Sequence, residues 1–253
     1  MSPLRPGLCS VTFRALAPDE VIATAVVAGL EGIEWGADVH LTPGEERAAR
    51  DVRRRSEDVG LGCPSYGSYL VAGKSSPARV PPVLATAVAL GATNVRVWCP
   101  FGARPGSDPE LFARTAADLA AWTASAADAG LTMSTEFHVD TFTETAAGTQ
   151  SLLDAAGRPA NLFTYWQPVA GRPLRDESAA VGPDVSHVHV FHWSDDGTRH
   201  PLAEGTAWPA LLGVLGADNR FAGDRYAFLE FVRDDDPAQV VADAATLRSW
   251  LGA

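Results

Sequence analysis

The chain has 253 residues, of which 46% are hydrophobic and 20% charged, as in a globular protein large enough to bury a substantial core. Its formal net charge of −11 argues against a nucleic-acid partner, which normally requires a basic surface. No apolar run approaches the roughly 20 residues of a membrane span, and the first ten residues lack the apolar segment of a signal peptide. Cys9, Cys63 and Cys99 are widely spaced in apolar contexts, as expected for buried thiols in a reducing compartment. We expect a cytoplasmic protein without a membrane partner.

Strand and helix patterns alternate from one end of the chain to the other. Strands are predicted at short apolar runs, and helices at longer runs that begin near Pro, Asp or Glu and often end at Gly. The first four strands are expected at 7–13, 32–35, 61–66 and 94–98, and the helices that follow them at 18–28, 43–59, 80–90 and 108–129. The last four strands are expected at 131–137, 162–166, 185–191 and 226–231, and the helices that follow them at 143–155, 172–181, 208–215 and 237–251.

This regular alternation predicts a parallel sheet and an α/β fold. Eight such units in about 250 residues favour closure into a (β/α)₈ barrel, formed by residues 1–253 as a single domain. A doubly wound open sheet is the alternative, but no predicted strand is followed by a GxGxxG or phosphate-binding loop. In a closed parallel barrel the C-terminal ends of all strands meet at one mouth, where active sites lie.

Two glutamates stand at the C-terminal ends of predicted strands. Glu136 shares a strand face with Ser134 and His138, and Glu230 lies between two apolar residues. A carboxylate in an apolar strand is costly unless it is paired or bound to a cation. Two of them facing one barrel axis would repel each other without a cation or a shared proton. The alternative for each is a solvated or arginine-paired glutamate at a strand end.

Histidines gather at the end of the seventh predicted strand. His187 and His189 share one face, and His192 follows one step beyond the strand. A single histidine more often packs in a core than binds a metal, but we expect one of these three to be a ligand, with His189 first and His192 as the alternative. Gln167 carries the only amide oxygen at the end of the sixth strand and is predicted either to bind a metal or to contact substrate hydroxyls. Carboxylate and imidazole ligands suit Mn²⁺, Zn²⁺, Co²⁺ or Fe²⁺, and further oxygen ligands favour Mn²⁺ or Mg²⁺.

Aromatic side chains also stand at predicted strand ends, among them Trp35, Trp98, Trp166 and Trp193. Such rings either fill the top of the barrel or stack on the C–H face of a sugar or polyol. The polar side chains that could orient this ligand are Arg14, Glu34, His40, Tyr66, Arg96, His138 and Asp140. A few placed polar groups in an aromatic pocket are the usual form of a small-molecule site. We predict as substrate-binding residues the four tryptophans together with His40, Tyr66, Arg96 and His138.

Four motifs carry a resemblance to a known family, and they are Gly32-Ile33-Glu34-Trp35, Thr135-Glu136-Phe137-His138, His187-Val188-His189-Val190 and Leu229-Glu230-Phe231. In this order and spacing they resemble the xylose isomerase-like TIM-barrel superfamily of sugar phosphate isomerases and epimerases, over nearly the whole chain. The resemblance implies one divalent metal ion, with Mn²⁺ as the first expectation, held by Glu, Asp, His and Glu from strands five to eight. Three of these ligands match Glu136, His189 and Glu230. The Asp has no match, and Gln167 is its nearest substitute, which leaves a more positive metal centre.

The resemblance also implies a reaction. Glu136 and Glu230 would move a proton at a carbon next to a carbonyl, while the metal polarises the carbonyl and stabilises the enediolate. We therefore expect a metal-dependent isomerase or epimerase acting on a sugar, keto-sugar or polyol, with a phosphorylated substrate less favoured. The alternatives are a lyase on the same site, either a keto-polyol dehydratase or a 3-keto-glycoside eliminase, and a non-catalytic sugar-binding barrel. The pattern allows a homodimer without requiring one.

Overall fold

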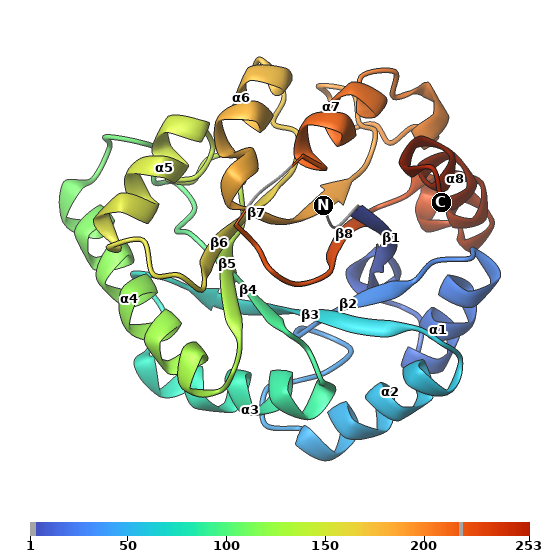
Figure 1. The fold of residues 1–253 in the computed structure, drawn as a ribbon, viewed down its shortest axis with the longest axis horizontal. Coiled ribbons are helices and arrows are strands. Elements are labelled where there is room, and N and C mark those ends of the chain that lie inside the picture. The colour runs from blue at the N-terminus through green and yellow to red at the C-terminus, as the bar shows by residue number, and fades with distance from the viewer. Residues whose placement is uncertain (1–3, 218–219) are drawn as a thin grey trace.

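The computed structural model describes residues 4–217 and 220–253, which form a closed barrel of eight parallel strands wrapped by helices (Figure 1). Each strand pairs with the next along the chain, and β1 closes the barrel by pairing with β8. The prediction of a (β/α)₈ barrel is confirmed. The C-terminal ends of all eight strands consequently lie at one end of the barrel.

The elements follow the predicted order closely. Strands β1–β8 occupy Leu4–Cys9, Gly32–Gly36, Gly62–Val71, Asn94–Trp98, Thr132–Thr135, Leu162–Trp166, Val185–Val190 and Arg225–Leu229. Helices α1–α8 occupy Pro18–Val27, Glu46–Asp58, Val80–Leu90, Pro109–Asp128, Ala146–Ala155, Leu174–Val181, Trp208–Leu215 and Pro237–Leu251. Strands β4 and β6 and helices α3, α7 and α8 have the predicted bounds.

Local capping explains why helix ends are readable from the sequence. At the start of α4 the side chain of Asp108 accepts the backbone N–H of Leu111 at 2.9 Å, and Pro109 occupies a position that needs no N–H donor. At helix C-termini the chain turns into the left-handed region, which costs glycine least. Gly91 ends α3 with a φ of 76°, and Gly130 follows α4 with a φ of 72°.

Strand β1 begins and ends earlier than predicted, at Leu4 and Cys9. It ends at Cys9, and Ser10–Phe13, which we expected to continue the strand, form a short 3₁₀ helix. The Ser10 hydroxyl accepts the backbone N–H of Gly36 at 2.9 Å, so a side chain takes over the pairing that a longer strand would have made with β2.

Strand β3 is longer than predicted. We expected it to end at Tyr66 and to pass into a loop, but it continues to Val71. Val71 pairs with Trp98 after an irregularity in the β3–β4 register that follows Gly67. The extension depends on a partner strand, which is why the local pattern did not reveal it.

Strands β5 and β8 end one residue before the two predicted catalytic glutamates. β5 stops at Thr135 and β8 at Leu229. The backbone N–H groups of Glu136 and Glu230 still donate to the neighbouring strands, at 3.0 and 3.1 Å. Both carboxylates are thus fixed to the rigid barrel at its mouth, rather than carried on a mobile loop.

Aromatic rings fill the barrel interior, and glycines make room for them. A Cβ atom on Gly7 would lie 2.5 Å from the ring of Phe228, and one on Gly32 would lie 2.7 Å from the ring of Tyr226. The rings of Tyr226 and Phe228 stack with centroids 5.4 Å apart. The barrel is therefore a packed core below the mouth, not an open channel.

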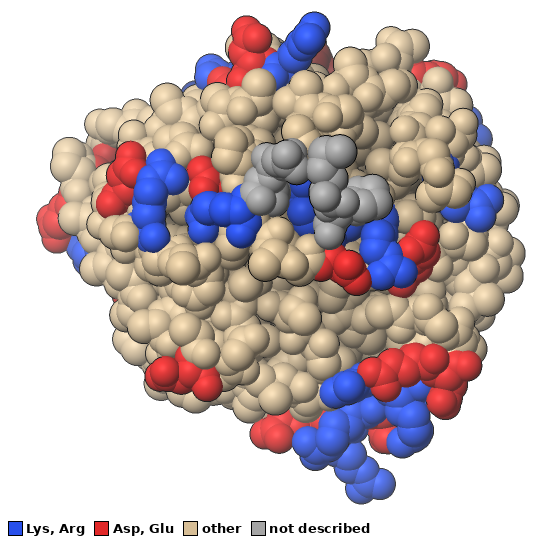
Figure 2. Space-filling model, in the orientation of Figure 1, with Lys and Arg blue, Asp and Glu red and all other residues tan. Residues whose placement is uncertain are grey.

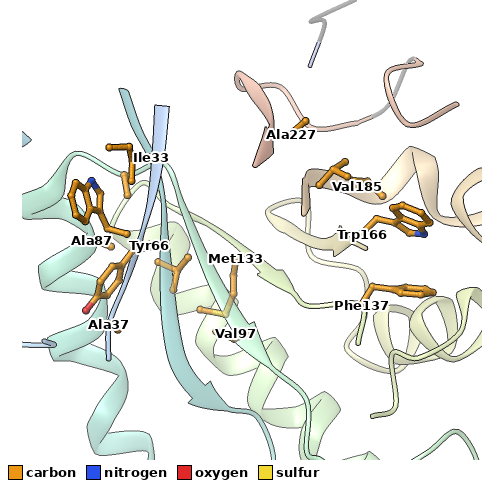
Figure 3. Packing of buried hydrophobic residues seen from close by; sticks show 14 of the residues in the cluster. Ile33, Ala37, Tyr66, Ala87, Val97, Met133, Phe137, Trp166, Val185 and Ala227 are labelled. Carbon is orange, nitrogen blue, oxygen red and sulfur yellow. The ribbon is translucent and has the colours of Figure 1, made fainter. Parts of the chain in front are cut away.

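A second apolar layer separates the strands from the helices (Figure 3). Tyr66 and Trp166 are fully buried in it. Trp166 packs edge-on against Trp208 of α7, with ring centroids 5.9 Å apart, and the Tyr66 hydroxyl donates to the carbonyl of Leu41 at 2.5 Å. These large side chains fix α7 and the loop after β2 against the barrel wall.

Charged side chains stand in groups of mixed sign on the face drawn in Figure 2, with the largest group over α2. There Arg53 pairs with Glu57 at 2.7 Å and Arg54 with Asp51 at 3.0 Å. Exposed pairs of this kind contribute little to stability, so the group is a solvated helix face. Among the described residues, no helix is long and apolar enough to cross a membrane.

Candidate active site

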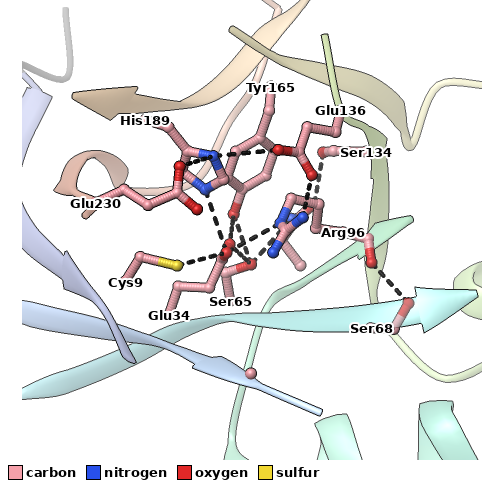
Figure 4. A network of polar contacts seen from close by, with 12 residues as sticks. Cys9, Glu34, Ser65, Ser68, Arg96, Ser134, Glu136, Tyr165, His189 and Glu230 are labelled. Carbon is pink, nitrogen blue, oxygen red and sulfur yellow. Dashed lines mark hydrogen bonds and ion pairs between the residues drawn. The ribbon is translucent and has the colours of Figure 1, made fainter. Parts of the chain in front are cut away.

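Charged and polar side chains converge on the barrel axis at the C-terminal ends of the strands (Figure 4). They are held by rigid elements, because alternate residues of each strand point into the barrel. None is more than 6% exposed. The group consists of Glu34 from β2, Arg96 from β4, Tyr165 from β6, His189 from β7, and Glu136 and Glu230 just after β5 and β8.

Arg96 is the cation at the centre of this group. Its Nε donates to Glu34 Oε1 at 2.9 Å, and its Nη1 donates to Glu136. Its guanidinium carbon lies 5.4 Å from the ring centroid of Trp98 and 5.9 Å from that of Tyr165. Burial opposes its charge, but the two carboxylates raise the pKa of Arg96 well above its ordinary value. A permanent positive charge is therefore buried at the barrel mouth.

Glu34 is a fully buried carboxylate that is surrounded by donors. Its Oε1 accepts from Arg96 and lies 3.2 Å from Nε2 of His189. Its Oε2 accepts from the hydroxyls of Ser65 at 3.0 Å and Tyr165 at 2.5 Å. Although burial opposes it, the charge of Arg96 holds the pKa of Glu34 well below its usual range. We expected Glu34 to orient a substrate, but the structure makes it a buried counter-ion beneath the site.

His189 connects Glu34 to the other carboxylates. Its Nδ1 lies 3.3 Å from Gln167 Oε1, 3.5 Å from Glu136 Oε1 and 3.5 Å from Glu230 Oε2. Burial lowers the pKa of this imidazole, but the nearby carboxylates, Glu230 first, outweigh burial and raise it well above its ordinary value. The carboxylates around the ring therefore favour positive charge at this position.

The side chains of the predicted metal-ligand set meet around His189 Nδ1. Ligand atoms bound at about 2.0–2.2 Å to one tetrahedral cation lie roughly 3.4 Å apart, and the distances from Nδ1 to the three oxygens have this size. With a neutral His189, the carboxylates of Glu34, Glu136 and Glu230 outnumber the guanidinium of Arg96 by two negative charges. Donor types and charge fit a divalent cation.

The two glutamates of this set differ in proton affinity. Burial opposes the charge of Glu136, but Arg96 lowers the pKa of this carboxyl below its ordinary value. Burial and the charge of Glu136 raise the pKa of Glu230, although His189 acts in the other direction. Neighbouring titratable groups whose pKa values are pushed apart can serve as base and acid.

Cys9, Glu34 and His189 form a further group of possible metal ligands, with atoms within 4.8 Å of one another. Burial and the charge of Glu34 raise the pKa of the Cys9 thiol to about 12, so the thiol keeps its proton unless a metal ion displaces it. Glu34 is also already held by Arg96. The two groups of possible ligands share His189, which offers Nε2 to this group and Nδ1 to the other.

A cavity of about 820 Å³ opens above the cluster. Of the predicted substrate-binding residues, Arg96, Trp98, His138 and Trp193 line it. His192, the alternative ligand, also lines the cavity, with its ring 5.4 Å from that of His200. His189 rather than His192 therefore lies against the two glutamates.

The structure does not place the other predicted substrate-binding residues in the cavity wall. Three of them are aromatic residues that directly follow a residue pointing into the barrel. Because side chains alternate along a strand, these three rings point outward toward the helices. These outward rings are Trp35, Tyr66 and Trp166, which follow Glu34, Ser65 and Tyr165. His40 is buried behind them, 3.0 Å from the Ser10 hydroxyl.

Tyr165 and Ser65 contact the site but are not among the predicted site residues. The Tyr165 hydroxyl lies 2.6 Å from the Ser65 oxygen, and both contact Glu34. Tyr165 has the strand parity of Gln167, and on this signal it is a candidate that ranks below Gln167. For Ser65 we find no comparable local signal, because its role depends on β2 and β6 together.

No family model and no curated protein matches this sequence. Its fold is similar to that of the probable 3-DHS dehydratase AsbF from Bacillus anthracis, with a TM-score of 0.81 and 18% identity over 96% of this chain and 98% of that chain. It is also similar to D-allulose 3-epimerase from Methylomonas sp., with a TM-score of 0.74 and 17% identity over 99% of each chain. For the IOLI protein with a bound zinc atom, the TM-score is 0.76 and the identity 12% over 98% of each chain.

Xylose isomerase domain proteins are also among the matched structures. The predicted resemblance to xylose isomerase-like TIM-barrel proteins is thus confirmed as a shared fold. At these identities the similarity establishes the fold alone, and activity has to be argued from the site.

Arg96 should be essential for stability. Arg96→Met would leave Glu34 and Glu136 buried without their guanidinium, so we expect the free energy of unfolding to fall by about 3–5 kcal/mol in urea denaturation. The matched control is Arg104→Met, because Arg104 is 61% exposed and pairs with Asp140 at the surface. It should leave stability nearly unchanged, and equal losses in the two variants would contradict the role assigned to Arg96.

His187 lies below the active site among aromatic rings, and its Nδ1 accepts the backbone N–H of Tyr226 at 3.1 Å. Burial lowers its pKa from 6.5 to about 3. The unfolded chain therefore binds a proton at this residue, between pH 3 and 6.5, that the folded chain does not bind.

The free energy of unfolding should accordingly rise with pH across this window, by up to about 1.4 kcal/mol per pH unit from this residue. His187→Gln removes the titrating group and should reduce the slope in guanidinium denaturation series recorded at several pH values. A variant with the wild-type slope would show that His187 does not titrate as described.

Proposed function

We propose that this chain is an enzyme that transfers a proton at a carbon next to a carbonyl in a sugar or keto-polyol, as an isomerase or epimerase does. The observation that supports it best is the placement of Glu136 and Glu230 on either side of His189 Nδ1, both lining one cavity. The similar folds support the same class, because they include a D-allulose 3-epimerase, an L-ribulose 3-epimerase and a probable dehydratase.

In this mechanism Glu136 is the base, because Arg96 keeps it ionised. It removes the proton from the carbon next to the carbonyl. Glu230 takes up a proton more readily and donates it on the other face of the same carbon or to the neighbouring oxygen. Arg96 acts as a positioning residue, since it holds Glu136 through Nη1 without lying between the two glutamates and His189.

The proposed cofactor is one divalent cation held by Glu136, Gln167, His189 and Glu230. When bound, such a cation polarises the substrate carbonyl and stabilises the negative charge of the enediolate. Mn²⁺ is our first choice for this oxygen-rich set, ahead of Zn²⁺, Co²⁺, Mg²⁺ and Fe²⁺. The zinc atom in the similarly folded IOLI structure supports a metal centre.

The substrate we propose carries no phosphate. Each arginine that lines the cavity is already paired with a carboxylate. Arg14 pairs with Asp38 at 2.9 Å, Arg96 with two buried glutamates, and Arg172 with Glu177. In the described part of the cavity wall, every guanidinium is thus neutralised before a ligand enters. A neutral polyol suits this wall better than a phosphate ester.

A lyase on the same site is the second candidate. It shares the first step, removal of the proton next to the carbonyl, and differs in that a group on the next carbon then leaves. The observation in its favour is the room above the glutamates, where a leaving group fits. Product mass separates the two reactions, because elimination lowers the mass and isomerisation conserves it.

Replacement of either glutamate should abolish proton transfer. We expect Glu136→Gln and Glu230→Gln to slow deuterium incorporation from D₂O into a panel of keto-sugars, followed by NMR, by at least about 100-fold. Circular dichroism checks that both variants are folded. Glu57→Gln, on the exposed face of α2, is the control and should exchange at the wild-type rate. Full exchange in either active-site variant would rule out this mechanism.

Metal content tests the cofactor separately. Elemental mass spectrometry of purified, never-chelated protein should find close to one Mn, Zn, Co or Fe per chain, and Glu230→Ala should lose it, because the site then lacks one of its two carboxylate ligands. Glu57→Ala is the matched control. Wild-type protein that holds no metal, even after added Mn²⁺ and dialysis, would refute the metal centre and favour a non-catalytic sugar-binding barrel.

A further inference from the structure

The cavity is larger than its reacting groups require. Its volume of about 820 Å³ is near the upper end of the roughly 300–1,000 Å³ typical of sites for drug-sized ligands. Glu136, Gln167 and Glu230 lie together at the barrel end of it. A free monosaccharide held there would leave much of the cavity to water.

One side of the cavity is an aromatic wall at the ends of β4 and β5. It consists of Trp98, Phe101 and His138, all of which line the cavity. Each pair of these rings has a centroid separation of 5.1 Å. The ring of Trp98 also covers the guanidinium of Arg96, so this wall begins directly at the charged cluster.

A second aromatic wall stands at the ends of β7 and β8. Its rings are Phe191, Trp193 and Phe231, with centroids 4.8 and 5.7 Å apart in successive pairs, and they too line the cavity. Because β4 and β8 are four places apart in a closed order of eight strands, they lie on opposite sides of the barrel. The two walls therefore stand on different parts of the barrel rim and line the same cavity.

These rings expose apolar surface to water. Phe101 is 55% exposed and Trp193 is 38% exposed. A contiguous patch of exposed apolar side chains often marks a ligand-binding site. Flat apolar groups are what such rings bind best, by stacking or edge-on contact.

Phe231 adds an independent observation. It directly follows Glu230 and has a φ of 51°, in the left-handed region that a residue with a bulky side chain rarely adopts. Its N–H donates to Thr12 Oγ1 at 3.1 Å, and the guanidinium carbons of Arg14 and Arg199 lie 5.6 and 5.1 Å from its ring centroid. Glycine would relieve this strain, so a strained aromatic ring beside a catalytic carboxylate points to a binding role for the ring.

We propose that the substrate is a glycoside-like molecule, in which a neutral carbonyl-bearing sugar ring is joined to a flat, uncharged aromatic group. The sugar ring lies at Glu136 and Glu230, and the aromatic group lies between the two walls. The placement of the sugar ring rests on the proposed function. The aromatic subsite rests on the two walls and on the strain at Phe231.

Binding of non-reacting glycosides tests this subsite. Isothermal titration calorimetry of the full chain should find phenyl β-D-glucopyranoside bound roughly ten- to a hundredfold more tightly than methyl β-D-glucopyranoside, because the phenyl ring is buried as a phenylalanine side chain would be. Phe101→Ala and Trp193→Ala truncate exposed rings, one from each wall, and should each reduce this preference. Trp250→Ala removes a partly buried tryptophan of α8 outside the cavity lining and should keep it.

Equal affinity for the two glycosides, or no detectable binding of either, would overturn the proposal. A phenyl preference that persists in both wall variants would overturn it as well, because the ring would then lie elsewhere. Binding of these probes requires no turnover, so a negative deuterium-exchange result leaves the aromatic subsite standing. A protein that exchanges deuterium in keto-sugars but shows no phenyl preference would keep the proposed function and lose this substrate class.

Discussion

The architecture of the site depends on a buried guanidinium between two carboxylates. Arg96 neutralises Glu34 and Glu136 at a point where neither is more than 2% exposed. Removing charges from water is expensive, and the cost is offset only when geometry and remaining hydrogen bonds are satisfied. The hydroxyls of Ser65 and Tyr165 complete the shell of Glu34. The ends of five neighbouring strands, β2 to β6, are thereby tied together at the mouth of the barrel.

This constraint separates the roles of the carboxylates. Both oxygens of Glu34 are occupied by hydrogen bonds within the protein. Glu136 is kept ionised by Arg96, and its other oxygen lies near His189. Glu230 lacks a guanidinium partner among the described residues, and its pKa is raised by burial and by the charge of Glu136. The pKa values of Glu136 and Glu230 thus shift in opposite directions because Arg96 pairs with Glu136 and not with Glu230.

Above the charged cluster the cavity wall is largely aromatic rather than charged. The cavity wall carries two groups of aromatic rings, whose interactions with a ligand would come from apolar contact rather than charge. Phe231 connects the two zones, because the strained backbone that presents its ring directly follows Glu230. The cavity therefore has a rigid polar end at the barrel and an aromatic end above it.

The sequence by itself determined the barrel, because periodicity, helix caps and strand ends are local properties that recur eight times along the chain. It also located Glu136 and Glu230, since polar residues at the ends of apolar strands are visible locally. Only the tertiary structure decided which strand residues face the axis, because strands buried on both faces lack polar alternation. It alone paired Glu34 with Arg96 and His189, 62 and 155 residues away, since contacts between distant strands leave no local signal.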